Sequence, residues 1–411
     1  MRYTQKLVAL VVLTVAAPLL VAQQDGFYEL PGELPPGPSG VVGVTNTLGV
    51  ARVLIDISGD VESGSDLGQI MEQLMTPGDL YQAAGSLDSE IVEGSSVGAR
   101  AADAAAASTV GRRMTALREG AETGVAAGDL LSVHGFWVQG YYNDTEQDTR
   151  EMVNGFDADT TGIAIGVDAA VNDRVNAGVA VSWANTAVDS EGLEQNKMDI
   201  DSYRFTLYSA YNADDYYVDG QIAYSANQYD NKRNIIIGTY NSVAKSSHDG
   251  DQYSLRFRGG YPMAFDNGVY VTPRAGLEYT YLSEEDYKEK GAGNAGLAVR
   301  TDDVEVLLLK VGAKVLYPIV TESETTWIPE FSMDIIHDFI GDEVELDSNF
   351  LGAAAAAFVT QGANVEQTGV ATGLRVRTFN QSNYSFSAGY DYLYKKDYAS
   401  HSLNATVRYD F

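Results

Sequence analysis

The feature that most constrains this fold is the strict alternation of apolar and polar residues at the end of the chain, over residues 401–411. Leu403, Ala405 and Val407 alternate with Asn404, Thr406 and Arg408. Successive side chains of a β-strand point to opposite sides, so this pattern predicts a strand with one apolar and one polar face. The same period of two recurs upstream, most clearly over residues 175–183 and 384–392.

About twelve segments of this kind follow residue 131. They begin near His134, Thr160, Arg174, Ile200, Tyr216, Gln252, Val269, Val304, Trp327, Gly369, Asn383 and His401. An even number of alternating strands is typical of barrels that cross a bacterial outer membrane. The fold expected for residues 131–411 is therefore all-β, a 12-stranded antiparallel transmembrane β-barrel.

The connections between these segments alternate in length. Short turns are expected at residues 172–173, 213–214, 266–268 and 381–382, and longer connections at 143–159, 189–198, 230–249, 284–303 and 341–367. Short periplasmic turns and long outer loops are the asymmetry of outer-membrane barrels. A soluble β-sandwich is the alternative, but it does not explain this alternation.

The polar face of the predicted strands carries charges of both signs. A closed barrel with such an inner face must have a hydrated or plugged lumen in which the charges can pair. The residues expected to face the lumen are Arg204, Arg256, Arg258, Arg274, Glu278, Glu330, Arg375, Arg377 and Arg408, together with Lys310, Lys314, Asp168, Asp219, Asp334, Asp391 and Asp410.

Composition agrees with this class and excludes others. The chain has 27 Lys+Arg against 57 Asp+Glu, a formal net charge of −30, which does not suit a nucleic-acid binder. It contains no Cys, so it has no disulfide, no thiolate zinc site and no thiol nucleophile. Its mean hydropathy of −0.15 is compatible with a membrane barrel, because half of each spanning strand is polar.

The region before the barrel divides into three parts. Residues 1–22 have a basic start, an apolar core and a small residue at Ala22, the pattern of an export signal peptide. Residues 23–40 are rich in Pro and Gly and predict an extended linker or a vestigial displayed segment. Residues 41–130 are expected to be mostly helical.

Within that helical region, an alanine-rich helix is predicted at about residues 97–118. It carries Arg100, Arg112, Arg113 and Arg118, and also Asp103, so lipid would not accept it. At 1.5 Å per residue it would be about 33 Å long, enough to span a barrel lumen. We expect this helix to fill the pore.

Nothing in the sequence points to catalysis, a cofactor or a metal. Residues 94–98 match Gly-x-Ser-x-Gly, but no preceding strand or α/β sheet is present to build the nucleophile elbow that this motif needs. His134, His248, His337 and His401 are scattered without the spacing of metal ligands. We therefore expect no enzyme activity.

From about residue 131 onward the chain resembles the translocator barrel of classical (type V) autotransporters. The resemblance is carried by residues 135–140 (GFWVQG), 155–162 (GFDADTTG), 328–331 (IPEF), 387–391 (SAGYD) and 407–411 (VRYDF), in this order. It implies a barrel in the outer membrane of a Gram-negative bacterium that displays or secretes its own N-terminal passenger, with a helix in the pore. It also implies that Leu403, Val407, Tyr409 and Phe411 form the signal read by the barrel-assembly machinery.

The partners implied are outer-membrane lipid and lipopolysaccharide, the assembly machinery and periplasmic chaperones; a monomer is expected. The chain departs from the family in the shortness of its N-terminal region. It also has no Asn between Asn46 and Asn143 for cleavage between paired asparagines, so the N-terminal region is expected to stay attached. Two alternatives remain open: an adhesin-type or structural barrel whose loops bind a surface partner, and a diffusion channel.

Overall fold

The computed structural model describes residues 42–88, 93–122, 134–192, 194–322, 325–379 and 384–410. The expected signal peptide, the linker at residues 23–40 and Phe411 lie outside the described residues. No helix among those described is long and apolar enough to cross a membrane.

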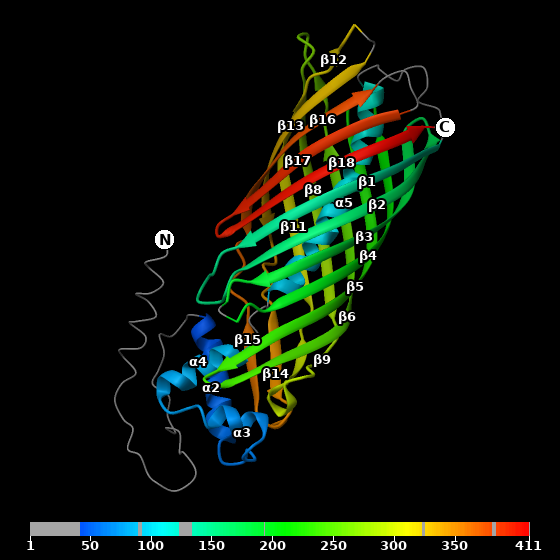
Figure 1. The fold of residues 1–411 in the computed structure, drawn as a ribbon. Helices are drawn as coiled ribbons and strands as arrows, with labels where there is room; N and C mark the ends of the chain where they lie inside the picture. Colours follow the sequence, from blue (N-terminus) through cyan, green and yellow to red (C-terminus); the bar gives the residue numbers. More distant parts are fainter. Residues whose placement is uncertain are drawn as a thin grey trace.

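Twelve antiparallel strands close into a barrel (Figure 1), which confirms the predicted fold class. Each strand pairs with its neighbour in the chain. The barrel closes through β1–β18 pairing from Gly135 with Asp410 to Gln147 with Tyr398. The strands are β1 His134–Gln147, β2 Phe156–Asn172, β3 Val175–Ser190, β4 Lys197–Asn212, β5 Tyr217–Ile237, β6 Tyr240–Gly260, β8 Tyr270–Glu284, β11 Val304–Leu316, β13 Thr326–Asp338, β16 Thr368–Phe379, β17 Tyr384–Lys395 and β18 Tyr398–Asp410.

The outer wall of the barrel is apolar because one residue in two points outward along each strand. Large apolar side chains exposed on this wall include Ile163, Val181, Phe205, Leu255, Val311, Leu374 and Val407. Closure leaves no strand edge unpaired, which a hydrocarbon environment requires because it offers no water to unpaired backbone groups. The wall therefore suits lipid in both its side chains and its backbone.

The two ends of the barrel differ. At one end lie the first strand residue, His134, and the last, Asp410; we call it the terminal end. Its turns are short, apart from two hairpin extensions, β7 Met263–Ala264 and β12 Ile319–Val320. At the other end, the capped end, the connections carry structure of their own.

Four short strands at the capped end form a second antiparallel sheet. They are β9 Tyr287–Lys288, β10 Leu297–Thr301, β14 Glu345–Phe350 and β15 Ala357–Gln361, with the short 3₁₀ helix η1 Gly293–Ala295 between β9 and β10. They come from two of the predicted long connections, 284–303 and 341–367. These connections are therefore ordered into a sheet.

The prediction of a long connection at residues 230–249 is wrong. Strands β5 and β6 continue through it and turn only at Gly238, whose φ of +56° lies in the left-handed region that glycine tolerates. The continuation is stable because Ile235, Ile237 and Ala244 are buried at the capped end. The polar run 230–234 hid this apolar face from sequence analysis.

Three helices pack on this end: α2 Val42–Ile57, α3 Asp66–Met71 and α4 Pro77–Leu87. A capping box starts α4, in which Thr76 and Asp79 each accept a backbone N–H bond from the other. Leu54, Ile70 and Leu87 share one buried apolar cluster with residues of the small sheet and of β5. We call α2–α4 together with β9, β10, β14 and β15 the cap.

Specific hydrogen bonds tie the helices to the barrel connections. Asn46 Nδ2 donates to the Gln361 carbonyl at 2.8 Å, and Gln361 N donates back to Asn46 Oδ1 at 3.1 Å. Leu67 N donates to Asn294 Oδ1 at 2.8 Å. The N-terminal helices and the connections thus form one folded unit.

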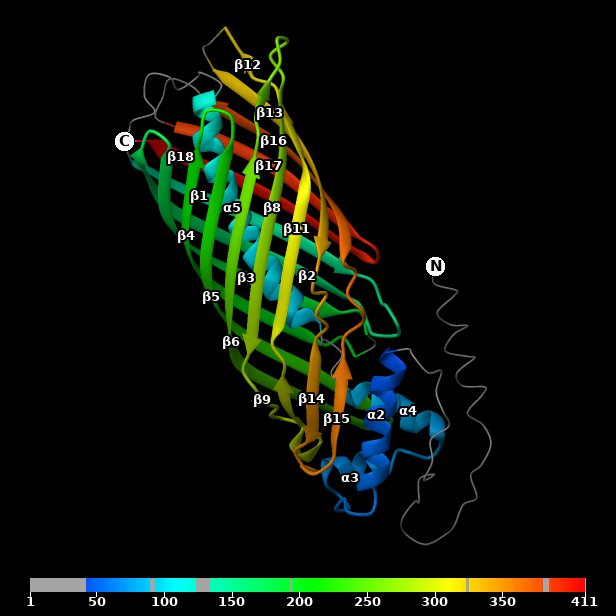
Figure 2. The same ribbon diagram turned by 180° about the vertical axis from the view of Figure 1, so that it is seen from behind.

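The long helix α5, Gly94–Glu122, runs through the barrel from the capped end toward the terminal end (Figure 2). It begins three residues before and ends four residues after the predicted helix at 97–118. At 29 residues it is about 44 Å long. It links the cap to the chain that enters β1.

Gly166 on the inner face of β2 is expected to be needed for packing. A Cβ there would lie 2.4 Å from the Trp137 ring, so Gly166→Val should cost about 1–3 kcal/mol of barrel stability through overpacking. Gly220→Val is the matched control, because a Cβ there meets Phe257 at an ordinary 3.5 Å. The midpoint of heat-induced unfolding on gels checks this; equal midpoints for both variants would contradict it.

Candidate functional site

The site is the interface between α5 and the inner barrel wall. The helix packs against β1–β5. Its apolar residues Ala102, Ala106, Val110 and Met114 share a buried cluster with small residues of the wall, Ala164, Ala180, Ala184 and Ala210, and with Trp137, Tyr141 and Tyr208. Alanine on both surfaces allows a close approach, so the slim helix predicted from sequence lies to one side of the lumen.

The large aromatic residues of this wall lie over glycines of the neighbouring strand. Trp137 pairs with Gly166 across the β1–β2 ladder and covers it. Trp137 Nε1 donates to the Tyr208 hydroxyl at 2.9 Å, and that hydroxyl donates to Asp168 Oδ2 at 3.0 Å. This chain of hydrogen bonds orients the carboxylate of Asp168 toward the helix.

Three of the four predicted helix arginines pair with barrel carboxylates. Arg113 Nε lies 2.5 Å from Asp168, Arg118 Nη1 lies 3.0 Å from Asp219, and Arg112 Nη1 lies 3.1 Å from Asp391. The Arg118 guanidinium also stacks over the Tyr217 ring at 3.3 Å. These contacts attach the helix to β2, β5 and β17.

Asp103 of α5 reverses the arrangement, because here the helix supplies the carboxylate and the barrel supplies the cations. Its carboxylate is buried between two barrel arginines, Arg204 and Arg256, and the Arg256 contact is 2.6 Å long. Ser225 and Ser254 also donate to it, at 3.4 and 3.3 Å. In the sequence, Asp103 is recognisable as a helix charge but not as a site residue. The signal for it was a pair of inward-facing arginines on β4 and β6, the two strands that flank β5.

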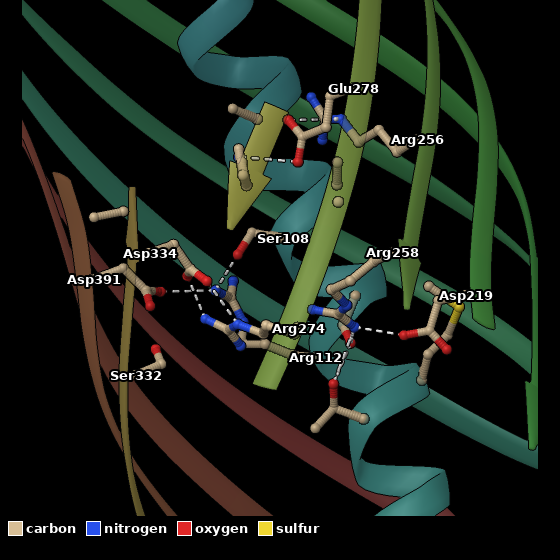
Figure 3. Close-up of a pocket in the computed structure, with 18 of the residues that line it drawn as sticks. Ser108, Arg112, Asp219, Arg256, Arg258, Arg274, Glu278, Ser332, Asp334 and Asp391 are labelled. Atoms are coloured by element: carbon tan, nitrogen blue, oxygen red, sulfur yellow. Dashed lines mark hydrogen bonds and ion pairs between the residues drawn. The ribbon is translucent and has the colours of Figure 1, made fainter. Parts of the chain in front are cut away.

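Other predicted lumen charges pair with one another, and Figure 3 shows Arg258 beside Asp219 and Arg274 beside Asp334. Arg258 contacts Asp219 at 2.7 Å, Arg274 contacts Asp334, and Glu278 contacts Lys310 at 2.9 Å. Glu330 forms ion pairs with Arg375 and Arg377, both with an N–O distance of 2.9 Å. Arg408 lines a small cavity beside Arg113 and Ala116.

The helix does not fill the lumen. On the side of β8, β11, β13, β16 and β17 two cavities of about 230 and 290 Å³ lie beside it. They share Ser108, Arg112 and Asp391 in their linings, so they lie next to each other. Charged groups of both signs border this space.

An ion pair and a hydrogen bond hold the start of α5 at the capped end. Glu93, immediately before the helix, pairs with Arg150 of the β1–β2 connection at 2.9 Å and accepts a hydrogen bond from the backbone N–H of Ala363. Burial raises the pKa of Glu93, and Arg150 opposes that rise. Ser95 and Ser96, from the Gly-x-Ser-x-Gly match, lie in the first turn of α5 and not in a nucleophile elbow.

The other predicted site residues lie as follows. Leu403 and Val407 face outward from β18, the backbone of Tyr409 belongs to that strand, and Phe411 lies outside the described residues. Within the described ranges no group of three or more His, Asp or Glu residues is placed to hold a metal ion.

A closed barrel with an apolar outer wall and its own N-terminal helix in the lumen belongs to the class of outer-membrane β-barrels. The family is also established: residues 136–391 match the autotransporter beta-domain model, so the chain belongs to that family. It is therefore an outer-membrane translocator barrel of a Gram-negative bacterium.

Curated relatives include Outer membrane protein B of Rickettsia conorii, 27% identical over 74% of this chain and 19% of the relative. Outer membrane protein A of Rickettsia rickettsii is 25% identical over 90% of this chain and 16% of the relative. The chain thus spans about a fifth of the length of the curated relatives that it matches. The translocator domain of the autotransporter NalP from Neisseria meningitidis shares the fold, with a TM-score of 0.58, 19% identity and coverage of 75% of this chain and 98% of that one.

The Asp103 cluster should hold the helix in place. Asp103→Asn leaves Arg204 buried without the carboxylate that it contacts, a loss of about 3–5 kcal/mol for a broken buried pair. Because the chain has no native Cys, labelling of Ala105→Cys reports helix undocking cleanly. We expect the label to react faster in Asp103→Asn than in the exposed control Asp56→Asn. Equal rates would show that the pair does not hold the helix.

Proposed function

We propose that the barrel displays its own N-terminal region at the cell surface, that α2–α4 are the displayed segment, and that this segment stays attached. The observation that carries the proposal is the path of the chain. The cap helices lie at the end of the barrel opposite His134 and Asp410, and α5 connects the two ends through the lumen (Figure 1). A chain that enters from the periplasm and threads its own barrel ends in this arrangement.

The proposal assigns the capped end to the outside and the terminal end to the periplasm. Short turns at the terminal end agree with that orientation. The cap supports attachment as well, because its helices share a buried apolar cluster with barrel connections, so release would expose that surface to water. The protein would act by translocation and display, without catalysis.

We further propose that the chain works as a monomer in outer-membrane lipid and lipopolysaccharide. Leu403 and Val407, with Tyr409 and Phe411, would be read by the assembly machinery after delivery by periplasmic chaperones. The outward position of Leu403 and Val407 supports this reading, since an exposed apolar row on the final strand is accessible to a pairing partner.

Surface display is tested with epitope tags on intact cells. A tag between Ser63 and Gly64, in the exposed turn before α3, should bind antibody without permeabilisation. A tag beside Asp173, in the β2–β3 turn at the terminal end, should bind only after permeabilisation. The opposite pattern would reverse the orientation, and protection of both tags would reject display.

The diffusion-channel alternative is tested in planar bilayers. The paired charges and packed alanines around α5 should keep the conductance of the wild-type barrel low, whereas deletion of residues 42–122 should raise it many-fold. High conductance in the wild type would favour a diffusion channel over a display barrel.

The adhesin-type alternative is tested by removing residues 345–361 alone. If cells then lose the ability to bind a surface partner, the adhesin-type alternative is favoured.

A further inference from the structure

The larger of the two lumen cavities is lined by two basic side chains that make no ion pair with the residues the structure describes. This cavity, of about 290 Å³, lies at the capped end of the lumen and includes Arg100 of α5 and Lys395 of β17 in its lining. The helix arginines 112, 113 and 118 all pair with carboxylates. Within the described ranges, neither Arg100 nor Lys395 makes an ion pair.

The donors of these two residues are largely unused by the described protein. Arg100 gives one hydrogen bond, from Nε to the Ser96 carbonyl at 3.2 Å, which folds the side chain back along the helix. Lys395 points inward because the odd-numbered residues of β17 face the lumen, as Asp391 does. Its neighbour Lys396 lies in the following turn with its side chain 72% exposed.

The six acids that border the same cavity contact other donors: Glu278, Glu366 and Asp391 pair with Lys310, Lys396 and Arg112. Asp338 Oδ1 accepts from the backbone N–H groups of Leu307 and Ile340, at 3.3 and 3.1 Å. Asp342 Oδ2 accepts from Glu305 N at 2.9 Å, and Glu93 is held by Arg150. The cavity therefore offers cationic donors and no carboxylate in contact with them.

One part of the cavity wall is apolar. Val97 and Ala101 of α5 face Val306 and Leu308 of β11, Ile336 of β13 and Leu393 of β17. A wall of this kind, with a few convergent polar groups and a volume near 300 Å³, is the usual form of a small-molecule site. The ion-paired arginines Arg112 and Arg256 also border this cavity.

We propose that this cavity binds a small organic anion, a carboxylate with a short apolar or aromatic group. The carboxylate of the ligand would accept hydrogen bonds from the guanidinium of Arg100 and the ammonium of Lys395. Such charge-assisted hydrogen bonds are stronger than hydrogen bonds between neutral groups. The apolar group would lie against Leu308 and Ile336. Arg150, Asp342 and Glu366 border the cavity toward the capped end, where the ligand would enter.

The test uses the full chain in lipid nanodiscs, with 4-fluorobenzoate as the probe and ¹⁹F NMR as the readout. Binding should be saturable, and Arg100→Gln and Lys395→Gln should each weaken it about tenfold or more. Arg100→Lys and Lys395→Arg should keep most of the affinity. The matched controls are Lys396→Gln and Arg52→Gln, which remove exposed cations outside the cavity and should bind as the wild type does.

Two further probes separate charge from apolar recognition. Uncharged 4-fluorobenzyl alcohol should bind weakly, and sulfate should compete only at much higher concentration than benzoate. Equal binding of alcohol and benzoate would overturn the role of the cations, and equal potency of sulfate would overturn the role of the apolar wall. Absence of 4-fluorobenzoate binding to protein with the gel mobility of a folded barrel would reduce the cavity to a water-filled space.

Discussion

The buried charge pairs between α5 and the barrel wall are the interaction on which the rest of the structure depends. Removing ions from water costs several kcal/mol each, and the cost is recovered only when the partners meet in good geometry. Asp103 between Arg204 and Arg256, and Arg113 on Asp168, meet that condition. Because these partners come from β2, β4 and β6, the helix has one position along and around the lumen in which all of them are satisfied. The pairs therefore specify where the helix stops more than they add net stability.

The position of the helix then determines where the cap can form. Glu93, which pairs with Arg150, lies one residue before α5. The position of α5 along the lumen therefore sets the distance of α2–α4 from the barrel. At that height the helices meet β14, β15 and the prolonged β5–β6 hairpin, whose inward residues Ile235 and Ile237 become buried. A helix shifted by one turn would move about 5.4 Å and lose both sets of contacts together. The ion pairs in the lumen and the cap are thus coupled through one rigid element, the helix α5.

Much of this arrangement is readable from sequence, for a physical reason. The period of two along residues 401–411 and its repeats record the lipid-facing wall directly, and the charges between the apolar residues, such as Arg204 and Glu330, record the lumen. What stays hidden depends on three-dimensional partners. Strands of two to six residues, such as β9 and β14, are too short to show a period. The polar run 230–234 masks a strand that becomes stable only under the cap. Asp103 looks like an ordinary helix residue until the two arginines facing it are known.

Alanine-rich packing explains why the lumen is both plugged and partly open. A helix able to thread a 12-stranded barrel must be narrow, and Ala102 and Ala106 against Ala164 and Ala180 give the closest approach that side chains allow. Close approach to one wall necessarily leaves space at the other, since twelve strands enclose more room than one slim helix occupies. That space is lined by residues of the barrel wall, including Lys395 and the apolar residues of β11, and the Lys395 ammonium makes no ion pair with any residue that the structure describes. A helix narrow enough to thread the barrel therefore leaves a second compartment beside itself, and the Arg112–Asp391 pair that attaches the helix to β17 forms part of the wall of that compartment.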